Sequence, residues 1–139
     1  MPITHSDVLE KILNAIGGTP LVAVSFKDIE AALPDGLSSE IVVSCKLEYM
    51  NPSGSVKDRV AREILERAMD EGRLKKGDTV VEASSGSTSI ALAHLCNHLQ
   101  LNFTAVIPVD ASEERRLSIR AYRSEKRRVG KECRSRWSP

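Results

Sequence analysis

The chain has no apolar run approaching the roughly 20 residues that a membrane-spanning helix needs. Its first residues, Met1 to Asp7, lack the basic start and the apolar stretch of a signal peptide. Cysteine is scarce. Cys45, Cys96 and Cys133 are far apart and form no C-x-x-C pair, which argues against a disulfide framework and against a zinc site. We therefore expect a cytoplasmic protein with no metal and no membrane partner, whose cysteines are buried free thiols.

An excess of charge of one sign is also lacking, since the net charge is only +1. This balance gives no general reason to expect a nucleic-acid partner. The charge is nevertheless unevenly distributed: residues 123–139 hold seven basic and two acidic side chains, whereas residues 1–122 are net acidic. The length of 139 residues, with 41% hydrophobic and 28% charged, fits one globular domain of ordinary size.

Short β-prone runs alternate with stretches of helical period along the chain. Strands are predicted near 21–24, 41–47, 79–82 and 103–107, and helices near 6–15, 55–72, 88–100 and 112–122. Ser6, Ser55 and Ser112 are the candidate N-caps, and residues 34–39 form a predicted surface loop. The alternation predicts an α/β fold whose sheet is mostly parallel and covered by helices.

The segment Ser53 to Arg59 places Lys57 in the first turn of a predicted amphipathic helix, directly after a small-residue turn. The positive end of a helix dipole disfavours a cation, and burial would further favour the neutral amine, which is a nucleophile and a base. The ordinary alternative is a solvated lysine. Spacing alone favours that alternative, because lysines are common at helix starts.

Residues 82–88, Glu-Ala-Ser-Ser-Gly-Ser-Thr, lead from a predicted strand into a predicted helix. Hydroxyl groups and unpaired backbone N–H groups would converge there beside the positive end of the helix, which suits a carboxylate or a phosphate. The segment lies at the carboxyl edge of the predicted strand, which is where open α/β sheets bind ligands. A capped turn of small residues without a ligand is an equally good interpretation of the segment taken by itself.

Three motifs follow one another along the chain. They are Ile16-Gly17-x-Thr19-Pro20-Leu21-Val22, then Asn51-Pro52-x-x-Ser55-Val56-Lys57-Asp58-Arg59, then Ser85-Gly86-x-Thr88. In this order they resemble the β-family of pyridoxal-phosphate enzymes, which includes cysteine synthase and cystathionine β-synthase. The resemblance spans residues 12–122 and implies the truncated N-terminal part of a fold-type II enzyme, a partial three-layer sandwich that uses pyridoxal 5′-phosphate.

The resemblance also implies roles for individual residues. Lys57 is the implied catalytic lysine, which binds the cofactor as a Schiff base and moves the Cα proton of the substrate. The residues implied to bind the substrate α-carboxylate are Ser84, Ser85, Gly86 and Thr88. Ser87 occupies a cofactor-binding position where the family usually has Asn. Serine has a shorter reach than asparagine, so this departure leaves the reaction type open.

The implied activity is β-replacement on serine or O-acetylserine, in which sulfide or a thiol adds to give cysteine or a thioether. The family resemblance also implies a homodimer. An alternative within the class is β-elimination, as in serine/threonine dehydratases and cysteine desulfhydrases. An alternative from another class is a non-catalytic binding module with a basic tail.

The family pattern stops after Tyr122. Residues 123–139 have no apolar period and no predicted place in a sheet, and they resemble the translation of a common short-read sequencing adapter. We expect residues 1–122 to be a partial catalytic domain and residues 123–139 a non-native or disordered basic tail, in preference to a nucleic-acid arm. The phosphate-binding loop of the family is expected after residue 122, so the chain itself is expected to be inactive.

Overall fold

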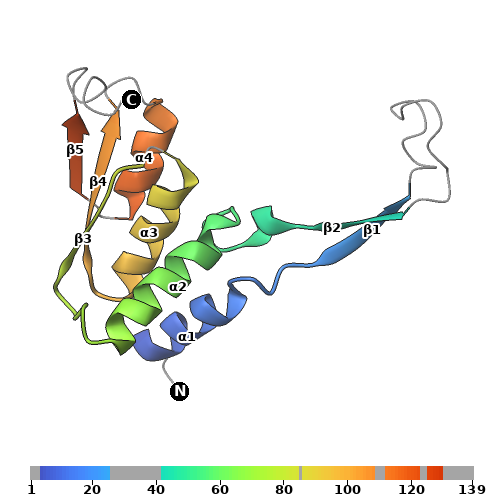
Figure 1. The fold of residues 1–139 in the computed structure, drawn as a ribbon, viewed down its shortest axis with the longest axis horizontal. Coiled ribbons are helices and arrows are strands. Elements are labelled where there is room, and N and C mark those ends of the chain that lie inside the picture. Colours follow the sequence, from blue (N-terminus) through green and yellow to red (C-terminus); the bar gives the residue numbers. More distant parts are fainter. Residues whose placement is uncertain (1–3, 26–41, 85, 109–111, 123–124, 130–139) are drawn as a thin grey trace, which may run out of the picture.

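The computed structural model describes residues 4–25, 42–84, 86–108, 112–122 and 125–129 (Figure 1). Its elements are α1 (His5–Ala15), β1 (Leu21–Ser25), β2 (Val42–Lys46), the 3-10 helix η2 (Glu48–Met50), α2 (Lys57–Asp70), β3 (Thr79–Glu82), α3 (Ser87–His98), β4 (Asn102–Pro108), α4 (Glu113–Ala121) and β5 (Glu125–Val129). Each strand and helix predicted from the sequence is present, with bounds that differ by a few residues at most. The predicted loop at residues 34–39 lies outside the described residues.

The larger sheet contains β3, β4 and β5, which are parallel and adjacent in that order. Parallel neighbours joined through a helix almost always form a right-handed crossover. Two such crossovers that advance in one direction bring α3 and α4 to the same side of the sheet (Figure 1). The α/β class is therefore confirmed, and the described residues supply the sheet and one helical layer of the expected sandwich.

The strand β5 corrects the expectation that nothing after Tyr122 would find a place in a sheet. Residues 125–129 pair with β4 in parallel register, from Thr104 opposite Glu125 to Pro108 opposite Val129. This pairing continues the β–α–β succession that the preceding strands establish. That residues 123–139 form a separate non-native or disordered unit stays a prediction.

The hydrophobic core lies between the larger sheet and the helices α2, α3 and α4. Its fully buried large side chains are Leu65 of α2, Leu95 of α3, Ile107 of β4 and Ile119 of α4. Most of α3 is buried, from Ser89 to Cys96, because α2 covers one side of it and β4 covers another. The central position of α3 explains why its sequence is apolar nearly all round rather than on one stripe.

The strands β1 and β2 form a separate antiparallel pair that extends away from the helices (Figure 1). Val22 pairs with Cys45 and Val24 with Val43, so one face of the pair is apolar. Leu21 and Val42, on the other face, are 64% and 59% exposed. The described part of the chain leaves both faces largely uncovered.

The helix α1 begins with a capping box, but not at the predicted residue. The Thr4 hydroxyl accepts from the Asp7 N–H, and the Asp7 carboxylate accepts from the Thr4 N–H at 2.8 Å. The prediction that Ser6 caps this helix is therefore wrong, since Ser6 lies inside it. A threonine followed by an acidic residue three positions later is the sequence pattern of such a box.

The described part of the chain contains no helix that is both long enough and apolar enough to span a bilayer. The buried thiol of Cys96 agrees with expectation, whereas Cys45 is only half-buried, and both are free. Burial raises the pKa of the Cys96 thiol to about 12, which makes it unreactive at neutral pH. Cys133 lies outside the described residues.

Candidate active site

Lys57 is the first residue of α2, directly after the turn formed by residues 51–56. Within this turn the Gly54 N–H donates to the Asn51 carbonyl at 2.8 Å, and the Lys57 N–H donates to the Ser55 hydroxyl oxygen at 3.2 Å. Ser55 therefore acts at the helix start, as predicted, although Val56 is the residue in the N-cap position. The side chain of Lys57 is exposed, which agrees with the alternative of a solvated lysine and not with a buried amine.

The residue after Lys57 is fully buried. Asp58 has no exposed surface, and its two carboxylate oxygens accept from Ser53: one from the backbone N–H at 3.0 Å and the other from the hydroxyl group. Ser53 and Asp58 lie on either side of Lys57 along the chain. The carboxylate therefore connects the beginning of the turn to the helix that carries the lysine.

A second network connects this turn to the motif around Gly17. The Arg59 guanidinium donates to the Glu48 carboxylate through Nε and Nη2, and Nη2 also donates to the Gly17 carbonyl at 2.9 Å. Asn51 joins both groups, because its Oδ1 accepts from the Gly17 N–H at 2.8 Å and its Nδ2 donates to Glu48 at 2.7 Å. The first two sequence motifs are thus held together by hydrogen bonds between their own residues.

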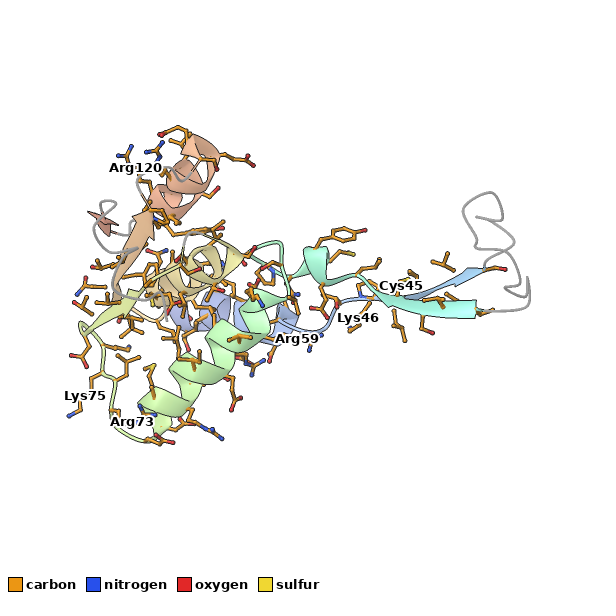
Figure 2. The ribbon with its side chains drawn as sticks, turned by 45° about the horizontal axis from the view of Figure 1, so that its top comes forward. Cys45, Lys46, Arg59, Arg73, Lys75 and Arg120 are labelled. Atoms are coloured by element: carbon orange, nitrogen blue, oxygen red, sulfur yellow. The ribbon has the colours of Figure 1, made fainter. Side chains whose placement is uncertain are left out.

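The charges in this network stabilise one another. The Arg59 hydrogen bonds hold the pKa of the Glu48 carboxyl below its ordinary value, and the Glu48 carboxylate raises the pKa of Arg59. Lys46, at the end of β2, donates to the Thr19 carbonyl and also to Gly17. Figure 2 shows Lys46 and Arg59 close together where the β1–β2 pair meets the start of α2.

The predicted carboxylate-binding segment leads from β3 into α3. The Gly86 N–H donates to the Ser84 hydroxyl oxygen at 3.3 Å, and the buried Ser89 hydroxyl donates to the Ser84 carbonyl. Gly86 is the N-cap residue and has no side-chain cap. Ser87 is exposed and Thr88 is half-buried in the first turn, while Ser85 lies outside the described residues.

The two predicted segments lie at neighbouring helix starts. The helices α2 and α3 pack against each other. Both begin on the side toward which the strands of the larger sheet point (Figure 1). A hollow of about 280 Å³ lies at the opposite end of α3, where it is lined by Asn97, Gln100 and Asn102 among others. We assign the site to the helix starts, since that hollow contains none of the residues singled out in the sequence.

The hydrogen-bonding roles of Glu48, Asn51, Asp58 and Arg59 were not predicted from the sequence. Asn51, Asp58 and Arg59 were quoted as parts of a family motif, without a task of their own. A signal was available for Asp58, because an acidic residue in the first turn of a helix is electrostatically favoured there. Nothing in the sequence predicts that Glu48 pairs with a side chain eleven residues later.

The three histidines of the chain lie together, one on α1 and two on α3. The rings of His94 and His98 meet edge to face with centroids 4.8 Å apart, and Tyr122 lies against His94 at 5.0 Å. His5 Nε2 is 2.9 Å from the His98 carbonyl oxygen. His94 is buried, and its Nδ1 has no hydrogen-bond partner among the described residues.

Burial lowers the pKa of His94, the neighbouring His98 lowers it further, and the Asp58 carboxylate opposes both effects. Burial and the adjacent His5 likewise lower the pKa of His98. A histidine with a lowered pKa takes up its proton more readily in the unfolded chain than in the folded one.

We therefore expect the free energy of unfolding to decrease as the pH falls from about 6.5, the ordinary histidine value, toward the lower pKa values of the folded state. Urea denaturation at a series of pH values measures this dependence. Replacing His94 by Gln should flatten the curve in this interval. An unchanged slope in that variant would show that His94 does not cause the dependence. Asp7 and Glu48 take up protons only at lower pH, because the pKa values of both carboxyl groups are below their ordinary values.

The two helix starts lie within a segment that matches a known protein family. The model of the pyridoxal-phosphate-dependent enzyme family matches residues 12–137. The chain belongs to that family. The match includes all three sequence motifs and also extends through β5.

Individual relatives have related but different activities. A cysteine synthase of Staphylococcus aureus is 40% identical over 117 residues, covering 84% of this chain and 35% of that protein. An O-ureido-L-serine synthase structure superposes with a TM-score of 0.73 at 39% identity, over 86% of this chain and 35% of the other. A hydrogen sulfide-producing enzyme of Fusobacterium nucleatum superposes with a TM-score of 0.77 at 30% identity, over 91% and 36%. The chain thus spans about a third of the length of these proteins.

The residues present fit the family's cofactor in two respects. Lys57 presents its side chain to solvent at the end of a hydrogen-bonded turn. Beside Gly86 the described residues leave open space, since a Cβ built there would meet none of their atoms within 4 Å. The start of α3, without a side-chain cap, faces this space and offers backbone N–H groups to an anion.

Proposed function

We propose that the whole protein catalyses a β-replacement reaction of the cysteine synthase type, with Lys57 as the lysine that binds pyridoxal phosphate. The substrates inferred are serine or O-acetylserine as the amino acid and sulfide or a thiol as the nucleophile. The observation that carries the proposal is the pairing of two helix starts: an exposed lysine at α2, and a small-residue segment without a side-chain cap at α3, on helices that pack together.

Pyridoxal phosphate, when bound, supplies a ring that accepts negative charge from the substrate Cα. In the proposed reaction the Lys57 amine would hold the cofactor, and Lys57 Nζ would later accept the Cα proton of the amino acid. Backbone N–H groups near Gly86, with the hydroxyl groups of Ser84, Ser85 and Thr88, hold the substrate carboxylate, and this alignment favours loss of the β-substituent.

The test is reductive trapping on the whole protein. A lysine amine condenses with the cofactor's aldehyde and releases water, and borohydride then reduces the resulting C=N bond to a stable C–N bond. Peptide mapping by mass spectrometry should find the pyridoxyl group mainly on Lys57. Labelling that is equal on Lys57, Lys75 and Lys76 would contradict the assignment, because Lys75 and Lys76 are exposed lysines in a turn remote from the site.

A second candidate function is β-elimination, and a specific observation favours it. Ser87, at the exposed start of α3, stands where the resembling family usually has Asn, and a relative similar in structure is a hydrogen sulfide-producing enzyme. In the whole protein, Ser87→Asn should increase the ratio of β-replacement product to released keto acid. Product analysis of the unmodified protein and of the Ser87→Asn variant, with the same substrate, measures that ratio. An unchanged ratio would remove Ser87 as a determinant of the reaction type.

We also infer a homodimer and a cytoplasmic location for the whole protein. The first inference rests on the family resemblance, and sedimentation of the purified protein tests it. The second rests on the free thiols of Cys45 and Cys96. Fractionation of the cells that produce the protein tests it.

A further inference from the structure

Asp58 is a fully buried carboxylate whose only hydrogen-bond partner among the described residues is Ser53. No lysine or arginine of the described ranges forms an ion pair with it. Burying a charged group is costly unless hydrogen bonds or an opposite charge compensate for it. The serine donates from both its N–H and its hydroxyl group, and the start of a helix dipole adds a favourable field.

The hydrogen bonds between Ser53 and Asp58 are important for the turn that they close rather than for the stability that they add. An apolar side chain of similar size would fill the same space without the cost of desolvating a charge. A carboxylate, unlike an apolar group, accepts two hydrogen bonds in fixed directions. Here they close a loop that runs from Ser53 through Gly54, Ser55, Val56 and Lys57 to Asp58. The lysine is therefore the last residue within a closed turn.

The turn has few other restraints. Gly54 adopts a φ of +87° and has no atom near its Cβ position, so it contributes no packing. Val56 is 43% exposed. The remaining internal contacts are the Gly54 N–H to Asn51, the Asp58 N–H to the Ser55 carbonyl at 3.4 Å and the Lys57 N–H to the Ser55 hydroxyl. Among the described residues after Asn51, the pair of Ser53 and Asp58 is the side-chain link between the beginning of the turn and the first turn of α2.

Asp58 also lies against the buried interior on its other side. It is close enough to His94 of α3 for its charge to act on that ring, as the opposing effect on the pKa of His94 shows. The helix α2, which begins at Lys57, packs against α3. The start of α3 carries the segment proposed to bind the substrate carboxylate.

We propose that Asp58 is a positioning residue, whose two hydrogen bonds with Ser53 fix the turn that presents the Lys57 amine to the cofactor. This inference depends on the proposed function, since it assigns a task relative to the cofactor lysine. Because Asp58 is fully buried, it presents no surface to a substrate or a cofactor. Asp58 orients Lys57, and this effect is measurable as the preference of pyridoxal phosphate for Lys57 over another lysine.

The experiment is a time course of reductive trapping with pyridoxal phosphate on the whole protein, read as the ratio of labelling at Lys57 to labelling at Lys75. The variants are Asp58→Ala, Ser53→Ala and Asp58→Asn, with Asp70→Asn as the matched control because Asp70 is exposed at the end of the same helix. Circular dichroism establishes conditions under which each variant is folded.

We expect Asp58→Ala to lower the ratio about tenfold, since small misplacements of a reacting group cost one to two orders of magnitude in rate. Ser53→Ala should have a smaller effect because the backbone N–H bond remains. Asp58→Asn should largely restore the ratio, because its amide can pair with both Ser53 groups. Asp70→Asn should leave the ratio unchanged.

A role in stability alone would move the unfolding midpoint of the folded variants without changing the ratio, and that result would overturn the inference. If Asp58→Ala does not fold, the comparison of Ser53→Ala with Asp58→Asn decides, and wild-type ratios in both would overturn it. Absence of any preference for Lys57 in the unmodified whole protein would instead overturn the proposed function, and the inference with it.

Discussion

Replacing Lys57 by alanine should lower the kcat of the whole protein by about 10²–10⁴-fold, which is the typical contribution of a positioned acid–base group. The reason is that the proposed mechanism uses this amine twice, to hold the cofactor and to accept the Cα proton. Steady-state assay of β-replacement measures the effect. Absorbance spectra should show the cofactor bound without its covalent link.

The matched control is Lys75→Ala, which removes an exposed lysine from the turn before β3. This variant should keep the wild-type kcat and the wild-type spectrum. A Lys57→Ala protein that retains wild-type kcat would refute the assignment of Lys57. Equal losses in both variants would point to a general effect of removing positive charge.

Replacing Gly17 by alanine should destabilise the fold by at least about 1–2 kcal/mol, the cost of placing an L side chain in the left-handed region. Gly17 has a φ of +81°, and a Cβ at this position would lie 2.6 Å from Nη1 of Arg59. The Arg59 guanidinium would have to shift, which would weaken its hydrogen bond to the Gly17 carbonyl and leave Asn51 as the remaining link. Urea denaturation measures the change in the free energy of unfolding.

Gly72→Ala separates the two causes. Gly72 also has a positive φ, +69°, but a Cβ there would meet no atom within 4 Å, so only the backbone cost applies. The difference between the two variants therefore reports the contact with Arg59. Equal destabilisation in both would mean that the guanidinium moves aside without loss.

The helices and strands were predictable because their signals are local. The apolar period of α2 and the short β-prone runs of β3 and β4 depend only on neighbouring residues. The start of α1 was misplaced by two residues because two hydroxyl residues, Thr4 and Ser6, compete for the cap. Only the Asp7 carboxylate, three residues after Thr4, distinguishes them.

The strand β5 was missed for a related reason. Its sequence, Glu-Lys-Arg-Arg-Val, has no apolar alternation, and the charges indicate a solvated tail. Pairing with the free edge of β4 uses backbone groups, which every non-proline residue has. A strand of this kind is therefore specified by the strand beside it and not by its own side chains.

By itself the sequence determined the α/β class, the order of the elements, the family resemblance and the candidate Lys57, because motifs and periodicity are written along the chain. Only the tertiary structure decided that Lys57 is exposed, that Asp58 is buried against Ser53, and that Arg59, Glu48 and Asn51 join the turn to Gly17. The physical reason is distance. Hydrogen bonds form between groups a few ångströms apart in space, and residues 17 and 59 become neighbours only after the chain has folded.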